Sequence, residues 1–487
     1  MRRAVLLVGL SVALGVVLRV APSAQSVATA YLSPPKVVAD IMDAEPLPGV
    51  ALSPDRRTML LSHRHSMPSI AEVSAPFDRL GGSRINPRTN GPRVLNGTTA
   101  LTMKDVASGA ERKLALPAGG SYNGVFSPDG KKVAVTFTTT NSIQLLVADV
   151  ATGAVKPVLA GGINGLGGGC NWLDDSSGFL CALIPDGRGA PPVEPTVPTG
   201  PAVQENDGRV APSATYEDLL KNPYDEALYD YFYTSQIAWV DLGGKKTPIG
   251  KPAIYAELQM SKDANWLLVS RVKHPFSYVV PAFQFPRDVE LWDKTGRLVK
   301  TLADMPMGDT FPRNGVYPGP RAFRWHPIEP ATLIYTEALD KGDPTVKVPF
   351  RDRIVAIKAP FTAPPVEWFK TEWRAAGVTF SEKGSILLTE TDRDLRMRRS
   401  WLYLDGVAST PQKVWELRQQ DRYRDPGSPV PRPSTGTFME VGGSVYMTGL
   451  GASPKGDRPF VDKRNHQNQK TPRGGECVDT SYATGVA

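Results

Sequence analysis

The chain has 487 residues, of which 41% are hydrophobic and 22% charged, the balance of an ordinary soluble globular protein. Its net charge of +7 comes from 56 Lys and Arg against 49 Asp and Glu, and the basic residues are scattered along the chain. The densest basic cluster, residues 393–399, is interrupted by Asp394 and has one aromatic nearby, Trp401, which argues against a nucleic-acid partner. The 45 Gly and 45 Pro indicate many turns, and therefore a β-rich fold with short strands.

Residues 1–30 are predicted to be an export signal. Arg2 and Arg3 precede an apolar run at residues 4–18, which has the length of a signal-peptide core and is short for a membrane span. Small residues for cleavage follow at Ala24 and at residues 28–30. The alternative is an uncleaved N-terminal anchor. With cleavage, we expect an exported protein, periplasmic or secreted, that has no membrane attachment after signal removal.

An apolar residue, a turn similar to Ser-Pro-Asp-Gly and an apolar strand recur along the chain. The pattern is most complete in "FSPDGKKVAVTF", which begins at Phe126. Its seven occurrences begin at Leu52, Phe126, Trp172, Met260, Trp325, Phe380 and Phe438. Each occurrence predicts a β-hairpin, because the turn joins two apolar runs of strand length.

A second turn follows the first by a few tens of residues, and in it a strand ends in Asp before a short Gly turn. This turn occurs at Asp105, Asp149, Asp241, Asp293 and Asp405, and residues 353–360 take the same place without the Asp. Two hairpins per repeat give a four-stranded antiparallel sheet. The 44 residues between the first two of these aspartates fit the length of a propeller blade, about 40–50 residues.

We therefore predict an all-β fold, a β-propeller of about seven four-stranded blades over residues 31–465, with the last blade incomplete. Radially stacked blades bury each other's faces, which one four-stranded sheet cannot do alone. An open β-solenoid and separate sandwiches are the alternatives. Residues 466–487 continue no periodic pattern and are predicted to be an aberrant or disordered tail.

The third blade carries a predicted insertion at about residues 185–235. Residues 185–213 are rich in Pro and Gly and predict a loop, whereas residues 215–236 predict a short broken helix. Thr215 with Asp218 resembles a helix cap, and Pro223 is expected to interrupt the helix. An insertion of this length is typical of a lid or a docking surface, and a floppy surface loop is the alternative for its first half.

Two of the three cysteines are predicted to face each other across one hairpin. If Trp172 and Phe179 are cross-strand partners, Cys170 and Cys181 are partners too, because both pairs are symmetric about the same turn. In an exported protein they can form a disulfide if their side chains approach closely enough. Two free buried thiols are the alternative.

The sequence has no recognisable catalytic, metal or cofactor site, and no metal and no cofactor are expected. The Gly-rich segment at residues 161–169 lacks the Lys of a phosphate-binding loop, and no G-x-S-x-G nucleophile elbow is present. No metal-ligand spacing is found among the histidines, which are His63, His65, His274, His326 and His466.

Six segments of the chain, taken in order, carry a family resemblance. They lie at residues 31–55, 177–192, 215–236, 274–292, 423–429 and 449–462, and the last two are "YRDPGSP" and "GLGASPKGDRPFVD". Together they resemble the N-terminal propeller of prolyl oligopeptidase family serine peptidases, and more narrowly the glutamyl endopeptidase group. The resemblance implies a propeller that restricts access of peptides to a C-terminal α/β-hydrolase domain carrying Ser, Asp and His. No position of this sequence matches that triad, so no catalytic residue is assigned.

Selectivity for glutamate implies fixed cations, because a carboxylate entering a low-dielectric site must be paired. The candidates for the substrate path are Arg271, Lys273, His274, Arg351 and Arg399. A structural or surface ion pair is the alternative for each arginine and lysine. His274 stands where members of this group tend to have Arg, a departure that puts a preference for acidic residues in doubt.

The leading hypothesis is the propeller part of an exported prolyl oligopeptidase-type serine peptidase. It is expected to be truncated before the hydrolase domain, inactive alone, and linked to peptide substrates only through that missing domain. An exported propeller that binds peptide or protein without catalysis is the second hypothesis. A propeller enzyme such as a glycosidase or quinoprotein is the third, and it would need paired carboxylates or a cofactor site.

Overall fold

The computed structural model describes residues 34–197, 215–433 and 435–465. The predicted export signal and the predicted tail lie outside these ranges. The chain divides into two compact parts, residues 1–44 and 45–487. In the first part, helix α2 (Lys36–Met42) carries an ion pair between Lys36 Nζ and Asp40 Oδ2 at 2.6 Å. No helix within the described ranges is long and apolar enough to cross a membrane.

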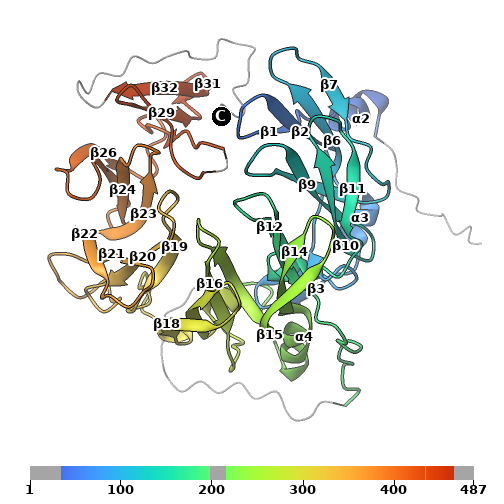
Figure 1. The fold of residues 1–487 in the computed structure, drawn as a ribbon, viewed down its shortest axis with the longest axis horizontal. Helices are drawn as coiled ribbons and strands as arrows, with labels where there is room; N and C mark the ends of the chain where they lie inside the picture. Colours follow the sequence, from blue (N-terminus) through green and yellow to red (C-terminus); the bar gives the residue numbers. More distant parts are fainter. Residues whose placement is uncertain (1–33, 198–214, 434, 466–487) are drawn as a thin grey trace, which may run out of the picture. The chain divides into compact units, whose positions relative to one another are not determined.

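The second part consists mostly of antiparallel strands (Figure 1). Its first large sheet has eight strands, which make two four-stranded meanders. The first meander contains β1 (Gly49–Leu52), β2 (Thr58–Arg64), β6 (Thr98–Asp105) and β7 (Glu111–Lys113). The second contains β8 (Ser121–Phe126), β9 (Lys132–Thr138), β10 (Ile143–Asp149) and β11 (Val155–Leu159). They are joined only at Thr98 and Tyr122, so their hydrogen-bond ladders are nearly independent.

The third and fourth meanders share one long strand, β15 (Lys246–Met260). Its first part pairs with β14 and its second part with β16, so the last strand of one meander continues as the first strand of the next. The other strands of the third meander are β12 (Cys170–Trp172), β13 (Gly178–Leu183) and β14 (Thr234–Asp241). Those of the fourth are β16 (Trp266–Val272), β17 (Arg287–Asp293) and β18 (Leu298–Met305).

The fifth and sixth meanders are separate four-stranded sheets. The fifth contains β19 (Arg321–Trp325), β20 (Thr332–Ala338), β21 (Asp352–Lys358) and β22 (Val366–Thr371). The sixth contains β23 (Arg374–Phe380), β24 (Ile386–Asp392), β25 (Met397–Tyr403) and β26 (Gln412–Arg418).

The seventh meander is smaller than the others. One edge of β29 (Ser444–Gly449) pairs with both β27 (Ser428–Pro429) and β28 (Glu440–Val441), and the other edge pairs with β32 (Phe460–Asn465). The described residues therefore fill three strand positions in this meander. A small hairpin of β30 (Ala452–Ser453) and β31 (Gly456–Asp457) joins β29 to β32.

The repeated turns form hairpins where the sequence predicts them. The first turn joins β1–β2, β8–β9, β12–β13, β15–β16, β19–β20, β23–β24 and β28–β29. The Asp turn joins β6–β7, β10–β11, β14–β15, β17–β18 and β25–β26, and residues 353–360 lie in the β21–β22 hairpin. The predicted hairpins and the all-β class are confirmed.

A buried serine explains why the first turn recurs. Ser53, Ser127, Ser261 and Ser381 are each 0% exposed. In the β8–β9 hairpin, Ser127 Oγ donates to Asp129 Oδ1 at 2.6 Å and accepts from the backbone N–H of Lys132 at 2.9 Å. The turn thus satisfies its own buried hydroxyl, and a side chain without a hydroxyl could not make these bonds.

The aspartate of the second turn also has a local structural role. Asp293 Oδ1 accepts from the backbone N–H of Thr295 at 2.9 Å and from its hydroxyl at 2.6 Å, and Arg297 Nε donates to Asp293 Oδ2 at 2.9 Å. Burial opposes the negative charge of Asp293, but the hydrogen bonds from Thr295 and Arg297 outweigh it and lower the pKa of Asp293 to about 2.

Each meander shares an apolar cluster with the next one along the chain. From the first to the seventh meander, these clusters combine Leu60 with Val133, Leu145 with Phe179, Ile237 with Leu267, Leu291 with Leu333, Ile354 with Phe380, and Leu402 with Met447. Each sheet therefore buries a face by packing against the next meander.

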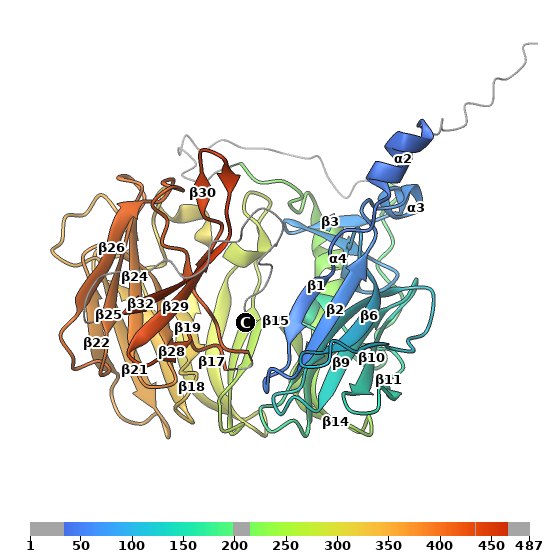
Figure 2. The same ribbon diagram turned by 90° about the horizontal axis from the view of Figure 1, so that it is seen from above.

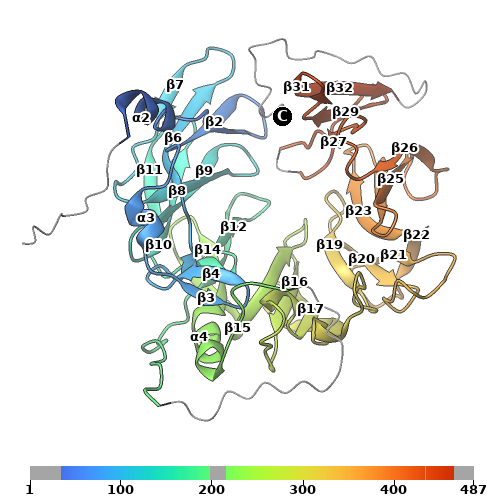
Figure 3. The same ribbon diagram turned by 180° about the vertical axis from the view of Figure 1, so that it is seen from behind.

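Three connections between second and third strands pack together into an aromatic core, which we call the insertion module (residues 70–92, 215–233 and 273–286). Its core includes Leu80, Tyr229, Phe276 and Phe285. Figure 3 shows β3 and β4 beside α4.

The elements of the insertion module are α3 (Ile70–Ser74), β3 (Asp78–Leu80), β4 (Ser83–Asn86), β5 (Gly91–Pro92), α4 (Pro223–Tyr233) and η2 (Ala282–Gln284). Two further short helices are η1 (Gly165–Gly167) and η3 (Gly308–Thr310). The sequence predicted only the connection that contains α4.

The start of α4 corrects a prediction. Pro223 begins the helix and does not interrupt it, and Asn222 caps it by accepting from the N–H of Asp225 at 2.9 Å. Proline suits this position because the first helical N–H has no intrahelical partner. The predicted cap at Thr215 and Asp218 is therefore wrong, and Asp218 instead accepts a hydrogen bond from Arg84 Nε at 2.7 Å.

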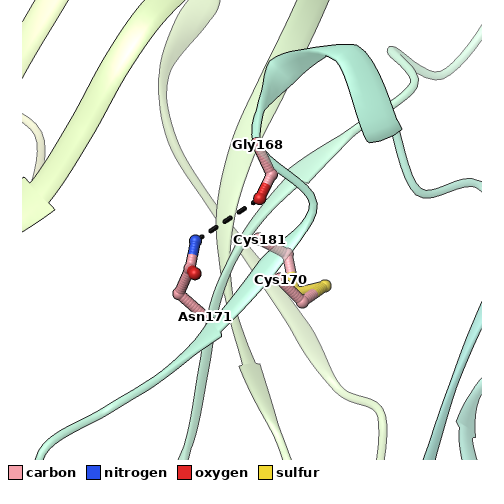
Figure 4. Close-up of a disulfide and its surroundings, with 4 residues drawn as sticks. All are labelled: Gly168, Cys170, Asn171 and Cys181. Carbon is pink, nitrogen blue, oxygen red and sulfur yellow. Dashed lines mark hydrogen bonds between the residues drawn. A yellow bond between two sulfur atoms is a disulfide. The ribbon is translucent and has the colours of Figure 1, made fainter. Parts of the chain in front are cut away.

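Cys170 and Cys181 are cross-strand partners in the β12–β13 hairpin, as the symmetry of the turn predicts, and a disulfide joins them (Figure 4). The N–H of Ala182 donates to the carbonyl of Gly169, and the N–H of Leu173 donates to that of Gly178. The cysteines lie between these hydrogen-bonded positions and so form a non-hydrogen-bonded pair, the kind whose Cα atoms lie closer together. Their Cα atoms are 4.0 Å apart.

We expect Ser127→Ala to lower the free energy of unfolding by about 1–3 kcal/mol, because it leaves the partly buried N–H of Lys132 without its acceptor. Denaturation in urea measures this change. Ser108→Ala is the matched control, since Ser108 is an exposed turn residue, and we expect it to change stability by at most about 0.5 kcal/mol. Equal losses for the two variants would contradict the role given to the buried serine.

Asp293→Asn should destabilise the protein in a pH-dependent way. A carboxylate whose pKa falls from 3.8 to about 2 on folding stabilises the fold above pH 3.8, and this contribution disappears as the pH falls towards 2. The difference in unfolding free energy between the wild type and Asp293→Asn should be constant above about pH 5 and shrink below about pH 4. Urea denaturation over that pH range tests this, and a difference that does not change with pH would argue against it.

Candidate functional site

Arg271, the first candidate cation, is already paired with a carboxylate. Its guanidinium donates from Nε and Nη2 to the two oxygens of Glu290, at 3.0 and 2.6 Å. Trp292 Nε1 donates to the same carboxylate at 2.8 Å. Glu290 is buried, and its hydrogen bonds raise the pKa of Arg271. The pair joins β16 to β17 inside the fourth meander.

Lys273 and His274 continue from the same strand and are also paired. Lys273 Nζ lies 2.7 Å from both Asp288 and Asp304, and hydrogen bonds to these two carboxylates raise the pKa of Lys273. His274 Nε2 lies 3.1 Å from Asp230 of α4. Burial raises the pKa of Asp230, and the interaction with His274 opposes that shift. His274 thus connects the insertion module's α4 to the segment that follows β16.

Arg399 in the sixth meander repeats the arrangement seen at Arg271. Its Nε lies 2.6 Å from the buried Glu390, and its Nη2 lies 2.7 Å from Glu372. Trp401 Nε1 donates to Glu390 at 2.6 Å, as Trp292 does to Glu290. Burial opposes the charge of Arg399, but the hydrogen bonds to Glu390 and Glu372 outweigh it and raise the pKa of Arg399.

Arg351 belongs to a network of charged residues that joins the fifth and sixth meanders. Two aspartates, Asp340 and Asp352, are 0% exposed. Arg374 reaches both, with Nη2 2.6 Å from Asp340 and Nη1 2.9 Å from Asp352. Arg351 adds a contact to Asp340 at 3.0 Å, and Arg321 adds one to Asp352 at 2.7 Å. Because Arg374 lies on β23, the network attaches the sixth meander to the fifth.

The candidate cations therefore fall into separate groups. Arg271 and Lys273 both approach Asp288, at 3.7 and 2.7 Å, whereas Arg351 and Arg399 lie in networks of their own. Each candidate has a carboxylate of this chain as its partner. In the structure these residues thus form ion pairs of the fold, and a substrate carboxylate would have to compete with those partners.

A pocket of about 610 Å³, which we call the end pocket, lies in the seventh meander. It is formed by two segments, residues 422–426 and residues 451–464. In Figure 2 the β30 hairpin projects beyond the ends of β29 and β32, and Ala452 and Ser453 of that hairpin line the pocket. The side of β32 that faces the pocket carries Phe460, Asp462 and Arg464.

This pocket is not predicted from the sequence, although its two segments overlap "YRDPGSP" and "GLGASPKGDRPFVD". Those stretches carry the family resemblance but do not indicate what they form together. A usable signal was the pair of arginines in these stretches, Arg424 and Arg458, together with Arg422 and Arg464 just outside them. Their proximity could not be predicted, because the segments are separated by β27, β28 and β29.

Another pocket, of about 220 Å³, lies beside the Gly-rich segment. Residues 165–169 line one side, and residues 255–258 of β15 line the other. Asn171 also lines it and donates to the carbonyl of Gly168 at 3.4 Å (Figure 4). Within the described ranges, no group of three or more His, Cys, Asp or Glu side chains is arranged to hold a metal ion.

Arg374→Met should lower the free energy of unfolding by about 3–5 kcal/mol, because it removes a shared partner from two fully buried aspartates. Arg297→Met is the matched control, since Arg297 is 80% exposed and pairs with Asp293 in an exposed turn, and the expected loss is about 0–1 kcal/mol. Urea denaturation of both variants measures the difference. A small loss for Arg374→Met would mean that the network contributes little to holding the meanders together.

Comparison with known proteins gives two curated relatives, while no family model matches the chain. The chain is 32% identical over 461 residues to a protein of Oryza sativa subsp. japonica named "Probable glutamyl endopeptidase, chloroplastic". The matched region covers 89% of this chain and 49% of that protein. It is 33% identical over 466 residues to the Arabidopsis thaliana protein of the same name, with coverages of 90% and 48%. The chain spans about half the length of these relatives.

Solved structures with some likeness include a prolyl endopeptidase, with a TM-score of 0.46 and 14% identity over 91% of this chain and 52% of that chain. Pyrococcus horikoshii acylaminoacyl peptidase gives a TM-score of 0.42 and 14% identity over 90% and 53%. The identity to the curated relatives, which extends over nine-tenths of the chain, confirms the resemblance found in the six segments. Over the matched residues, this chain is similar to proteins named as probable glutamyl endopeptidases.

Proposed function

We propose that the described residues are the β-propeller part of an exported prolyl oligopeptidase-type serine peptidase, and that they admit peptides without cleaving them. The observation that carries the proposal is the chain of shared cores. Each meander has an apolar cluster in common with the next, from the first to the seventh. Blades that stack around an axis bury their faces in this manner, and the matched relatives are named as endopeptidases.

The three strand positions of the seventh meander support an incomplete last blade. A four-stranded blade has a further strand beside its third, and β32 has no such neighbour among the described strands. Its outer edge is therefore the place where the blade would be completed.

A gating role requires a rigid wall, and the paired cations support such a wall. Arg271, Arg351 and Arg399 each tie a strand or connection to a buried carboxylate of this chain. Charged groups held in this way keep fixed positions, which suits a part of the protein that selects by size and shape. Catalysis in this proposal belongs to groups other than the described residues.

Export is supported by the disulfide between Cys170 and Cys181, because such bonds persist in oxidising compartments. The basic start and apolar run at residues 1–18 have the pattern of an export signal. These two features together support the proposal of a periplasmic or secreted location with the signal removed.

A second candidate function is an exported propeller that binds peptide or protein without any hydrolase. The end pocket favours it, because it is a built cavity formed by described residues alone. The two functions differ in what the isolated chain does. Only the binding module would act without a hydrolase domain.

The purified 487-residue chain is expected to leave peptides intact. The substrates are peptides with an internal glutamate between a fluorophore and a quencher. They should show no cleavage above a buffer control over hours of incubation, because the sequence carries no nucleophile elbow. A fluorophosphonate probe should likewise label no serine. Cleavage that this serine-directed probe blocks would contradict the non-catalytic role.

A further inference from the structure

We propose that the end pocket is a binding site for an extended peptide segment, recognised through its backbone. The inference deepens the proposed function, on which its peptide ligand rests. It assigns peptide contacts to the seventh meander, away from the candidate cations of the fourth, fifth and sixth. Its volume of about 610 Å³ lies within the range of small-ligand pockets and accommodates a few residues.

The rim charges of the end pocket are neutralised by partners in the fold. Arg422 lies 3.0 Å from Asp457, and Arg424 lies 2.6 Å from Asp421. Asp425 is paired with Arg398. The rim therefore does not explain which ligand the pocket takes, and the specificity has to come from the groups deeper inside.

Two groups inside the pocket lack partners. Asp462 is 6% exposed, and its Oδ1 has no hydrogen-bond partner among the described residues. The Nε of Arg464 is buried and likewise without a hydrogen-bond partner in that part of the chain. An unpaired buried oxygen of a carboxylate and an unpaired guanidinium N–H both cost free energy, which a ligand that satisfies them would recover.

The backbone fixes both groups on one side of β32. Asp462 pairs in register with Met447 and Arg464 with Val445, and these β29 residues are buried in the core shared with the sixth meander. The guanidinium of Arg464 also lies over the ring of Trp415, 5.6 Å from its centroid. Because alternate residues of a strand point to the same side, Asp462 and Arg464 stand roughly 6.6 Å apart along the strand.

An extended peptide presents the complementary groups at that spacing. It carries an N–H whose hydrogen bond Asp462 can accept and a C=O that can accept from the Nε–H of Arg464, and the groups on one of its sides repeat every two residues, as the side chains of β32 do. Tyr423, which is 65% exposed, and Phe460 supply aromatic surface for the ligand's side chains. A simple anion would satisfy Arg464 but would be repelled by Asp462, so a peptide fits better than a phosphate or a lone carboxylate.

The test is binding of a labelled peptide to the whole purified chain. The probe is a hexapeptide of five alanines and one lysine, acetylated, amidated and labelled with fluorescein on the lysine, and fluorescence anisotropy gives its Kd. Asp462→Asn and Arg464→Gln should each weaken binding roughly tenfold, the loss expected for a hydrogen bond to a charged group. Asp186→Asn is the matched control on an exposed loop and should leave the Kd unchanged.

A second measurement identifies the backbone as the recognised element. Replacing one peptide N–H at a time by an ester oxygen should weaken binding to the wild type at one position, and the same replacement should have little further effect in Asp462→Asn. Thermal unfolding establishes that each variant is folded. Tyr423→Ala is a further variant of the pocket, and because Tyr423 is exposed, this substitution leaves β32 intact. No binding by the wild type, or equal binding by Asp462→Asn and Asp186→Asn, would overturn the inference. The hydrolysis assay does not depend on this pocket, so failure here leaves the proposed function to its own test.

Discussion

An antiparallel sheet whose two faces are both apolar can bury them only with a neighbour on each side. This constraint organises the protein from residue 49 onwards. Phe179 of the third meander is fully buried in a cluster with Leu145 of the second, and Ile237 of the third shares another with Leu267 of the fourth. Each meander therefore depends on its neighbours for stability. The backbone adds to this at β15, where the third and fourth meanders are parts of one strand.

A buried amide, Asn164, connects this arrangement to the insertion module. Its Nδ2 donates to the carbonyl of Phe232 and to Ser235 Oγ, each at 2.9 Å, while its Oδ1 accepts from Asn90 Nδ2 at 2.7 Å. One side chain thus joins the Gly-rich segment to the end of α4 and to β5. The glycines beside it have a steric reason, since a Cβ at Gly167 would lie 2.3 Å from Ser235 Oγ. Gly168 and Gly169 have no such close neighbour but adopt positive φ angles of 101° and 65°, so close packing and turn conformation together account for these glycines without a phosphate ligand.

The parts of the fold that were predictable from the sequence are those decided by local chemistry. Ser127 and Asp129 bond within one turn, so their spacing is visible in the sequence, and the same holds for Asp293 and Thr295. The register of Cys170 and Cys181 follows from the symmetry of such a turn. The start of α4 was ambiguous because Pro223 suits the first turn of a helix and disrupts its interior, and only tertiary contacts decide between these positions.

The ion pairs and the end pocket were not predictable because they join segments far apart in the chain. Arg374 meets Asp340 and Asp352 across two meanders, and nothing in the sequence indicates which carboxylate an arginine will pair with.

The difference between the paired cations and the unpaired groups of the end pocket bears on how the protein could recognise a ligand. A substrate carboxylate at Arg271 or Arg399 would displace Glu290 or Glu390, each of which is buried and also holds a tryptophan N–H, so the displaced glutamate would lose several bonds at once. At Asp462 a ligand displaces no protein partner and adds a hydrogen bond to an atom that lacks one. Free energy for binding is therefore more readily available in the end pocket than at the paired cations, even though the cations are the more conspicuous residues in the sequence.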